Sequence, residues 1–425
     1  MLIHSASQLL TLRGGPQRGG DLGRLGIIED GAVLIKGEMI EAVGPSAELR
    51  SAYPGEPIYD AAGRVVMPGF VDPHTHLIWA GDRAGEFEMR LQGKNYLEIL
   101  AAGGGILSTV RATRSASVHD LIAATRPRLE TMLAYGTTTA EAKTGYGLDV
   151  ETELRMLEAL IRLDKAGPVD LAITFLGAHA IPPGYKGDPD GYTDLLCESA
   201  LPAVKKWWRE RAGEENELSS APGESGGLPF VDVFCETGAF SLAQSRRILE
   251  RAGDLGFPLK IHADEFDNLG GAALAARLGA VSADHLVATS PEDIAALAKS
   301  DTVAVALPCT PFGLAEAHYT PAREILAAGG LLALATDLNP GTAWCESMQF
   351  VLALATRYLG LTPAQAIAAA TINAAAAINR SNRIGSIEAG KQADLLVLSV
   401  PNYRHLGYRF GTNLVQTVIK KGRVV

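Results

Sequence analysis

Two histidines separated by a single residue, His74 and His76, follow an apolar run that begins at Val66. If this segment is extended, both imidazoles point to the same side, because side chains alternate along a strand. Pro73 restricts the backbone just before the pair. Two imidazoles on one face at a strand end can bind one metal ion. Chance neighbours on a polar loop are the alternative interpretation, which the pair alone leaves open.

Other residues able to bind a metal follow apolar runs farther along the chain: His179, His262, His285 and Asp337. One half-buried histidine bonded to a backbone carbonyl would need no metal, but five histidines in equivalent positions favour a metal site. Neutral imidazole and carboxylate suit zinc or ferrous iron, and three or four such ligands with an open position make a catalytic site. The ion lowers the pKa of a bound water, so that hydroxide forms near neutral pH.

A carboxyl group stands three residues after His262, at Glu265. Metal-assisted hydrolysis needs a second group that moves protons, and this position suits a general acid and base. The alternative interpretation of Glu265 is a solvated charge at the end of a strand.

Eight short apolar strands alternate with Ala- and Leu-rich helical stretches in the middle of the chain. The strands are expected to end near Val71, Ala142, Gly177, Cys235, Ala263, Ala283, Leu307 and Ala335. Such alternation predicts an α/β fold, a closed (β/α)8 TIM barrel. Functional residues of these barrels gather at the carboxyl ends of the strands, which is where the candidate ligands fall.

Both ends of the chain have the pattern of short strands and turns instead. We therefore predict a small β-sandwich-like domain composed of residues 1–66 and 379–425, attached to a metal-dependent barrel domain at 67–378. A segment rich in Glu, Ser and Gly, residues 211–227, predicts a flexible surface insertion in the barrel.

Composition and net charge limit the kinds of molecule that the protein is expected to bind. The net charge of -10 disfavours non-specific binding to nucleic acid and to anionic membranes, although a local arginine could still bind an anionic substrate. The four cysteines are scattered without a C-x-x-C spacing, as expected of reduced thiols in a cytoplasmic enzyme. The first residues lack the pattern of a signal peptide, and no apolar run is long enough to span a bilayer.

The ligand pattern resembles the amidohydrolase superfamily. Its members use a His-x-His after strand one, histidines after strands five and six, and an Asp after strand eight to hold a hydrolytic metal. Binuclear members usually carry a Lys at the end of strand four, and here that strand ends in Cys235-Glu236 instead. The sequence His262-Ala263-Asp264-Glu265 is similar to that of the mononuclear members, in which His-x-x-Glu supplies the acid and base.

A narrower resemblance, to the imidazolonepropionase family, runs nearly end to end. The motifs that carry it are residues 72–76 (DPHTH), 93–99 (GKNYLEI), 103–114 (GGGILSTVRATR), 143–148 (KTGYGL), 174–179 (TFLGAH), 336–341 (TDLNPG) and 402–406 (NYRHL). The segment at 211–227 is the main departure: we expect it to be longer than is usual in that family, and it touches none of these motifs.

The resemblance implies hydrolysis of 4-imidazolone-5-propanoate to N-formimidoyl-L-glutamate. It implies one divalent metal per chain, zinc or iron, bound by His74, His76, His262 and Asp337. His285 would hydrogen-bond the attacking water, Glu265 would move protons, and Glu265, His285 and Asp337 all stay open as the first proton acceptor. The substrate, a small molecule with a carboxylate tail, would contact Arg83, Tyr96, Tyr146, His179, Glu265, Asn339, Gly341 and Thr342. The family also suggests a homodimer.

Arg83 is the expected partner of the substrate carboxylate, because a guanidinium can donate two hydrogen bonds to it. A surface ion pair with Glu86 or Glu88 is the alternative interpretation. Two other functions stay open: a mononuclear aminohydrolase that deaminates a nucleobase, and a non-catalytic barrel that serves as an assembly scaffold. Arg83 and the Tyr146 motif disfavour the first, and the complete ligand set disfavours the second.

Overall fold

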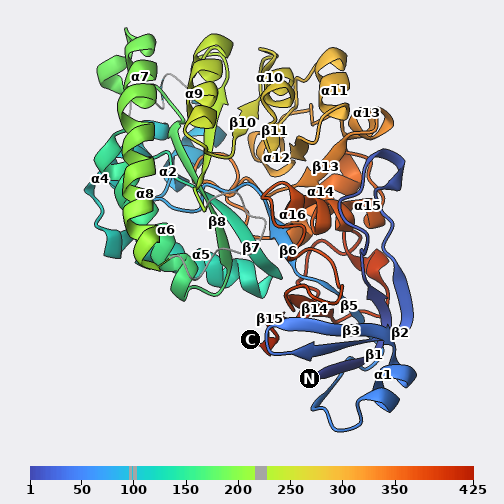
Figure 1. Ribbon diagram of the computed structural model, residues 1–425. Coiled ribbons are helices and arrows are strands. Elements are labelled where there is room, and N and C mark those ends of the chain that lie inside the picture. The colour runs from blue at the N-terminus through green and yellow to red at the C-terminus, as the bar shows by residue number, and fades with distance from the viewer. Residues whose placement is uncertain (95–97, 99–102, 216–226) are drawn as a thin grey trace.

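A computed structural model describes residues 1–94, 98, 103–215 and 227–425. It contains two sheets, of which the larger body in Figure 1 is a ring of eight parallel strands in sequential order. These strands are β6 (Phe70–Asp72), β7 (Thr137–Lys143), β8 (Asp170–Ala178), β9 (Phe230–Cys235), β10 (Lys260–Ala263), β11 (Ser282–His285), β12 (Val303–Ala306) and β13 (Leu331–Leu334). The predicted TIM barrel is confirmed, and each strand ends within two residues of its expected position.

Helices follow the strands and cover the outside of the ring (Figure 1). They are α2 (Ala84–Leu91), α4 (Ile106–Ser115), α5 (Val118–Ala134), α6 (Val150–Ala166), α7 (Pro189–Leu195), α8 (Leu201–Glu215), α9 (Leu242–Asp254), α10 (Gly271–Leu278), α11 (Pro291–Ala298), α12 (Cys309–Leu314), α13 (Ala322–Ala327), α14 (Met348–Tyr358), α15 (Pro363–Ala369) and α16 (Ile372–Ala376). One apolar cluster joins their inner faces to the strands. None of the helices that the structure describes is long and apolar enough to cross a lipid bilayer.

The second sheet is built from both ends of the chain, and the N and C labels lie beside it in Figure 1. Its order is β16-β15-β14-β5-β1-β2-β3, with β4 on β1. The strands are β1 (Leu2–Leu10), β2 (Ile27–Lys36), β3 (Met39–Pro45), β4 (Ile58–Asp60), β5 (Val65–Pro68), β14 (Leu395–Leu398), β15 (Val415–Lys420) and β16 (Arg423–Val424), with helix α1 (Ser46–Ala52) against them. Since β5 ends at Pro68, the expected boundary between residues 66 and 67 falls inside this strand.

The first and last barrel strands meet at a seam that runs directly into the predicted metal ligands. Beyond the strand ends, the Asp337 N–H donates to the His74 carbonyl at 3.1 Å, and the His76 N–H donates to Leu338 at 2.9 Å. Below them, the buried carboxylate of Asp72 accepts the Thr336 N–H at 3.1 Å and its hydroxyl at 2.5 Å. The ring is therefore closed by the same backbone that carries the His-x-His pair and the Asp.

The predicted insertion at 211–227 is only partly described. Its first residues, 211–215, continue helix α8, because Arg, Ala and Glu favour helix and extend the preceding turns. Residues 216–226 lie outside the described residues, so the flexibility expected there stays a prediction.

Candidate metal centre and active site

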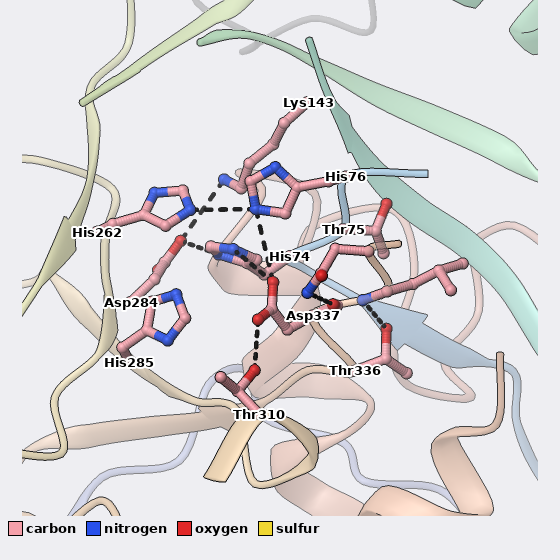
Figure 2. Close-up of polar contacts among 12 residues, drawn as sticks. His74, Thr75, His76, Lys143, His262, Asp284, His285, Thr310, Thr336 and Asp337 are labelled. Carbon is pink, nitrogen blue, oxygen red and sulfur yellow. Dashed lines mark hydrogen bonds and ion pairs between the residues drawn. The ribbon is translucent and has the colours of Figure 1, made fainter. Parts of the chain in front are cut away.

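Four predicted ligands converge at the carboxyl end of the barrel (Figure 2). The Nε2 atoms of His74 and His76 each lie 3.5 Å from Asp337 Oδ1. The His262 Nε2 lies 3.2 Å from that of His76. The ligand atoms of His74, His76 and Asp337 all fall within 4.8 Å of one another. His285 also lies beside this group, with its ring centroid 5.3 Å from that of His74.

The chemistry of these donors fits a divalent ion. Burial lowers the pKa of His74 and of His76 well below the usual range, so both rings are neutral and offer lone pairs. The His74 Nε2 and the Asp337 Oδ1 are buried without a hydrogen-bond partner among the described residues. The Thr310 hydroxyl donates to the other oxygen of Asp337, which leaves Oδ1 facing the imidazoles. These atoms have the types and arrangement of a metal site.

Two buried carboxylates orient the metal-facing rings from behind. Asp284 Oδ2 lies 2.6 Å from His74 Nδ1, and Asp232 Oδ2 lies 3.0 Å from His262 Nδ1. The hydrogen bond from His74 assigns its proton to Nδ1 and turns Nε2 toward the centre, as is common for metal-binding histidines. The His262 ring has its Nδ1 on the Asp232 side and its Nε2 beside that of His76. Sequence reasoning missed both partners. The available signal was a charged residue inside an apolar strand, as in Phe230–Cys235.

A buried ion cluster lies beneath these carboxylates. The ammonium of Lys143 lies 2.7 Å from Asp232, 2.8 Å from Glu141 and 3.6 Å from Asp284. Lys260 lies 3.2 Å from Glu141 and 3.9 Å from Asp284. Together with the carboxylate of Asp337, this cluster holds four carboxylates and two ammonium groups when all are ionised. The excess of two negative charges matches one divalent ion, because buried charge is costly unless it is paired.

Glu265 and His285 lie next to each other beside the predicted ligands. Their side chains approach to 3.7 Å between Glu265 Oε2 and His285 Nε2. Burial, with Asp337 and Glu236 nearby, raises the pKa of Glu265 well above its usual range. Burial lowers the pKa of His285, so its ring is neutral. A carboxyl group with a raised pKa, next to a neutral imidazole, can accept and return a proton near neutral pH.

Three non-glycine residues at these strand ends have left-handed backbone angles. They are Asp264 with φ 54°, His285 with φ 80° and Asp337 with φ 56°. Such angles cost energy for residues with a Cβ, and they persist only where the surrounding structure holds them. Two of them, His285 and Asp337, carry side chains that lie in the site, whereas the Asp264 carboxylate accepts a hydrogen bond from the Thr289 hydroxyl.

Arg83 lies at the start of α2, beside the turn that follows β13. Its Nε donates to Glu86 at 2.9 Å, so the expected alternative ion pair is present. The rest of the guanidinium still faces the turn, since a Cβ on Gly341 would lie 2.5 Å from Arg83 Nη1. Arg90 from the same helix donates to the Gly341 carbonyl at 3.1 Å. The ion pair and a ligand contact can coexist, because Glu86 uses only the Nε side.

The amide of Asn339 is used within its own turn. Its oxygen accepts the backbone N–H groups of Gly341 and Thr342, both at 2.8 Å. Its nitrogen donates to the Asp337 carbonyl at 2.7 Å and to the Thr342 hydroxyl at 3.0 Å. Asn339 thus shapes the segment that places Gly341 beside Arg83. Direct contact between this amide and a ligand stays a prediction.

Tyr146 and His179 follow β7 and β8 and lie beside the ring of His76. The His179 ring stacks on His76 with centroids 4.8 Å apart, and Tyr146 lies 5.3 Å from His179. Burial and the nearby His262 lower the pKa of His179 to about 3, which keeps the ring neutral. Tyr96, predicted from sequence as a further substrate contact, lies outside the described residues.

Comparisons with known proteins agree with this geometry. An amidohydrolase family model matches residues 238–425, a second amidohydrolase model matches 58–102, and an imidazolonepropionase-like composite domain of bacteria matches 31–55. The imidazolonepropionase of Herpetosiphon aurantiacus is 53% identical over 100% of this chain and 96% of its own length. That of Chloroflexus aggregans is 50% identical over 100% of this chain and 98% of its own.

Solved structures show the same fold at lower identity. A zinc-bound adenosine deaminase from Xanthomonas campestris superposes with a TM-score of 0.69 at 20% identity, covering 100% of this chain and 92% of that one. A 5-methylcytosine deaminase from Klebsiella pneumoniae superposes with a TM-score of 0.70 at 19% identity, covering 100% and 97%. The barrel with its terminal sheet is thus shared with enzymes of other specificities.

Proposed function

Since this chain belongs to the imidazolonepropionase family of the metal-dependent amidohydrolases, we propose that it hydrolyses the ring of 4-imidazolone-5-propanoate to N-formimidoyl-L-glutamate. The protein is a hydrolase that acts on a C–N bond, in histidine degradation. The full-length identity of about half to the named relatives carries the assignment. The convergence of His74, His76, His262 and Asp337 supports it independently.

We assign these four residues to a single divalent ion, zinc or iron, which supplies an activated water when bound. The charge of the buried cluster supports one ion per chain. A second carboxylate set, Glu141 and Asp284 with His74, could also hold a metal. The ammonium of Lys143 lies within 3.6 Å of both carboxylates and favours their pairing with lysine instead.

The protein's own groups account for the proton transfers. His285 is placed to accept a hydrogen bond from the attacking water, and Glu265 to take its proton. The water oxygen bonds to the ring carbonyl carbon and the C–N bond of the cyclic amide breaks. Glu265 then gives the proton to the leaving nitrogen, because its raised pKa lets it hold that proton near neutral pH.

The propionate tail is assigned to Arg83. Its Nε is occupied by Glu86, so a carboxylate would bind through the outer nitrogens that face Gly341. Tyr146, His179, Tyr96, Asn339 and Thr342 are proposed to surround the ring and the tail. Burial raises the pKa of Tyr146, so its hydroxyl stays protonated and can donate.

We further propose a cytoplasmic homodimer. The location rests on the small metabolite that the named relatives process and on four cysteines that are free thiols. The dimer rests on the family resemblance alone, and size-exclusion chromatography with light scattering tests it.

The decisive experiment is incubation of the purified protein with 4-imidazolone-5-propanoate, following loss of the ring absorbance, with metal analysis of the same sample. We expect turnover and about one divalent ion per chain. Ammonia release from adenosine or cytosine without turnover of the imidazolone would assign a nucleobase deaminase instead. Full folding with no bound metal and no turnover would favour a scaffold.

A further inference from the structure

The loop between β7 and α6 is wrapped around one buried carboxylate. Glu153, in the first turn of α6, is 1% exposed. Its two oxygens accept the backbone N–H groups of Gly145 at 3.0 Å, Gly147 at 2.8 Å and Leu148 at 2.9 Å. The metal centre does not use this carboxylate, and Glu153 is not among the site residues predicted from the sequence.

The conformation of the loop leaves little freedom around that carboxylate. Gly145 has φ +111°, and a Cβ there would lie 2.8 Å from the Leu176 carbonyl. A Cβ on Gly147 would lie 2.8 Å from Glu153 Oε1. Leu148 has φ 53°, an angle that its Cβ disfavours. Three hydrogen bonds to a charged acceptor are strong enough to hold such a backbone.

The same loop places two groups that face the proposed ring site. Tyr146 projects from its middle, with its ring 6.1 Å from that of His76. The carbonyl of Gly145 lies 3.0 Å from His179 Nδ1. This contact assigns the proton of the neutral imidazole to Nδ1, so Nε2 is left as a hydrogen-bond acceptor.

We propose that Glu153 is a positioning residue for substrate binding, acting through Gly145 on His179 and through the loop on Tyr146. The carboxylate holds the Gly145 peptide, and that peptide fixes the ring and tautomer of His179. The His179 Nε2 is then presented to an N–H of the imidazolone ring. This inference rests on the proposed function, because it concerns how the same substrate is held.

The test is Glu153→Gln in the metal-loaded enzyme. The amide oxygen of glutamine can accept the N–H groups of Gly147 and Leu148. Its NH2 group then faces the Gly145 N–H, which loses its acceptor. We expect KM for the imidazolone to rise about tenfold, the effect of one buried donor left unpaired, with kcat within about twofold and metal content unchanged. The matched control is Glu151→Gln, an exposed carboxylate in the same turn of α6.

A double-mutant cycle separates positioning from a general loss of structure. Combined with His179→Gln, the Glu153 substitution should cost less than it does alone, because one of the two groups it positions is gone. Combined with Arg83→Met, its cost should be unchanged. Additive effects in both cycles, or an unchanged KM, would overturn the inference.

Two further outcomes are distinguishable. If Glu153→Gln does not fold, Glu153→Asp tests the same contact, because it keeps the charge but draws the carboxylate back from the Gly145 N–H, and a normal KM there would reject the proposal. If the unsubstituted enzyme itself leaves the imidazolone intact, the proposed function fails, and this inference about its substrate fails with it.

Discussion

The metal side and the substrate side of this site are held by different means. The ligands sit on barrel strands or on the seam backbone, so the register of the sheet sets their spacing, and buried carboxylates only orient the rings. The substrate side consists of loops and helix α2, where side chains such as Glu153 and Asn339 accept backbone N–H groups. The comparison teaches that the proposed metal chemistry is built on the regular geometry of a barrel, whereas the proposed substrate recognition is built on locally shaped turns.

Removal of a seam ligand should have the largest effect. Asp337→Ala deletes one proposed metal ligand and the partner of the Thr310 hydroxyl. We expect bound metal to fall well below one per chain and kcat/KM to fall at least about a thousandfold, since the activated water is lost. Chelation of the unsubstituted enzyme should give the same loss, reversed by added metal. Retention of full metal content in this variant would show that the seam is not the metal centre.

Loss of the proton carrier should come next. Glu265→Gln keeps the shape and removes the basicity, so kcat should fall by about two or more powers of ten with metal content unchanged. We expect kcat to fall while metal content stays the same, because Glu265 lies beside the proposed ligands and is not assigned as one of them. Near-normal kcat would remove Glu265 from the mechanism, and loss of metal would move it into the ligand set.

On the substrate side, Arg83→Met should lower kcat/KM about a hundredfold without loss of metal, since the substrate carboxylate is left without its partner. Arg83→Lys should retain only part of the kcat/KM that Arg83→Met loses, because lysine lacks both the paired geometry and the Nε donor to Glu86. The loss should nearly vanish for an analogue without the carboxylate. Equal losses for both substrates would give Arg83 a structural role instead.

The smallest effect concerns the pH dependence of stability at the seam. Burial raises the pKa of Asp72 from its usual 3.8 to about 7. Between these values the folded protein binds more protons than the unfolded chain, so the free energy of unfolding should fall as pH rises, by up to about 1.4 kcal/mol per unit. Asp72→Asn should make this slope shallower by the share of Asp72, while Glu265, whose pKa is also raised, keeps part of the remainder.

The measurement is urea unfolding of both proteins between pH 4 and pH 7. The exposed Asp254, at the end of α9, supplies the matched control, since Asp254→Asn should leave the slope intact. A slope shared by unsubstituted protein and the Asp72 variant would show that other groups control the seam.

The sequence was sufficient to predict the barrel and to predict that the candidate ligands would converge. The His-x-His pair and the polar residues after apolar runs are local signals, and parallel strands bring their carboxyl ends to one edge whatever the loops do. The pattern could not reveal that Asp284 stands behind His74 or that Asp232 stands behind His262. Those pairings depend on which strands are neighbours and on side-chain direction, which no local pattern contains.

Loop residues were harder to interpret. Asn339 was expected to contact the substrate, and the structure shows its amide engaged by its own turn. Glu153 carries no signal in the sequence beyond an acidic residue, and only the folded loop shows three backbone donors around it. The predicted insertion at 211–227 begins inside helix α8, because the helix continues to Glu215.

The terminal sheet has a consequence for synthesis on the ribosome. Strand β5 lies between β1 and β14, and it ends just before β6, the first barrel strand. Its partner β14 is made only after the whole barrel has been translated. Until then β5 presents an unpaired strand edge, a feature prone to association with other chains. A chain truncated before β14 should therefore fail by aggregation, even though the truncation removes no residue of the proposed site.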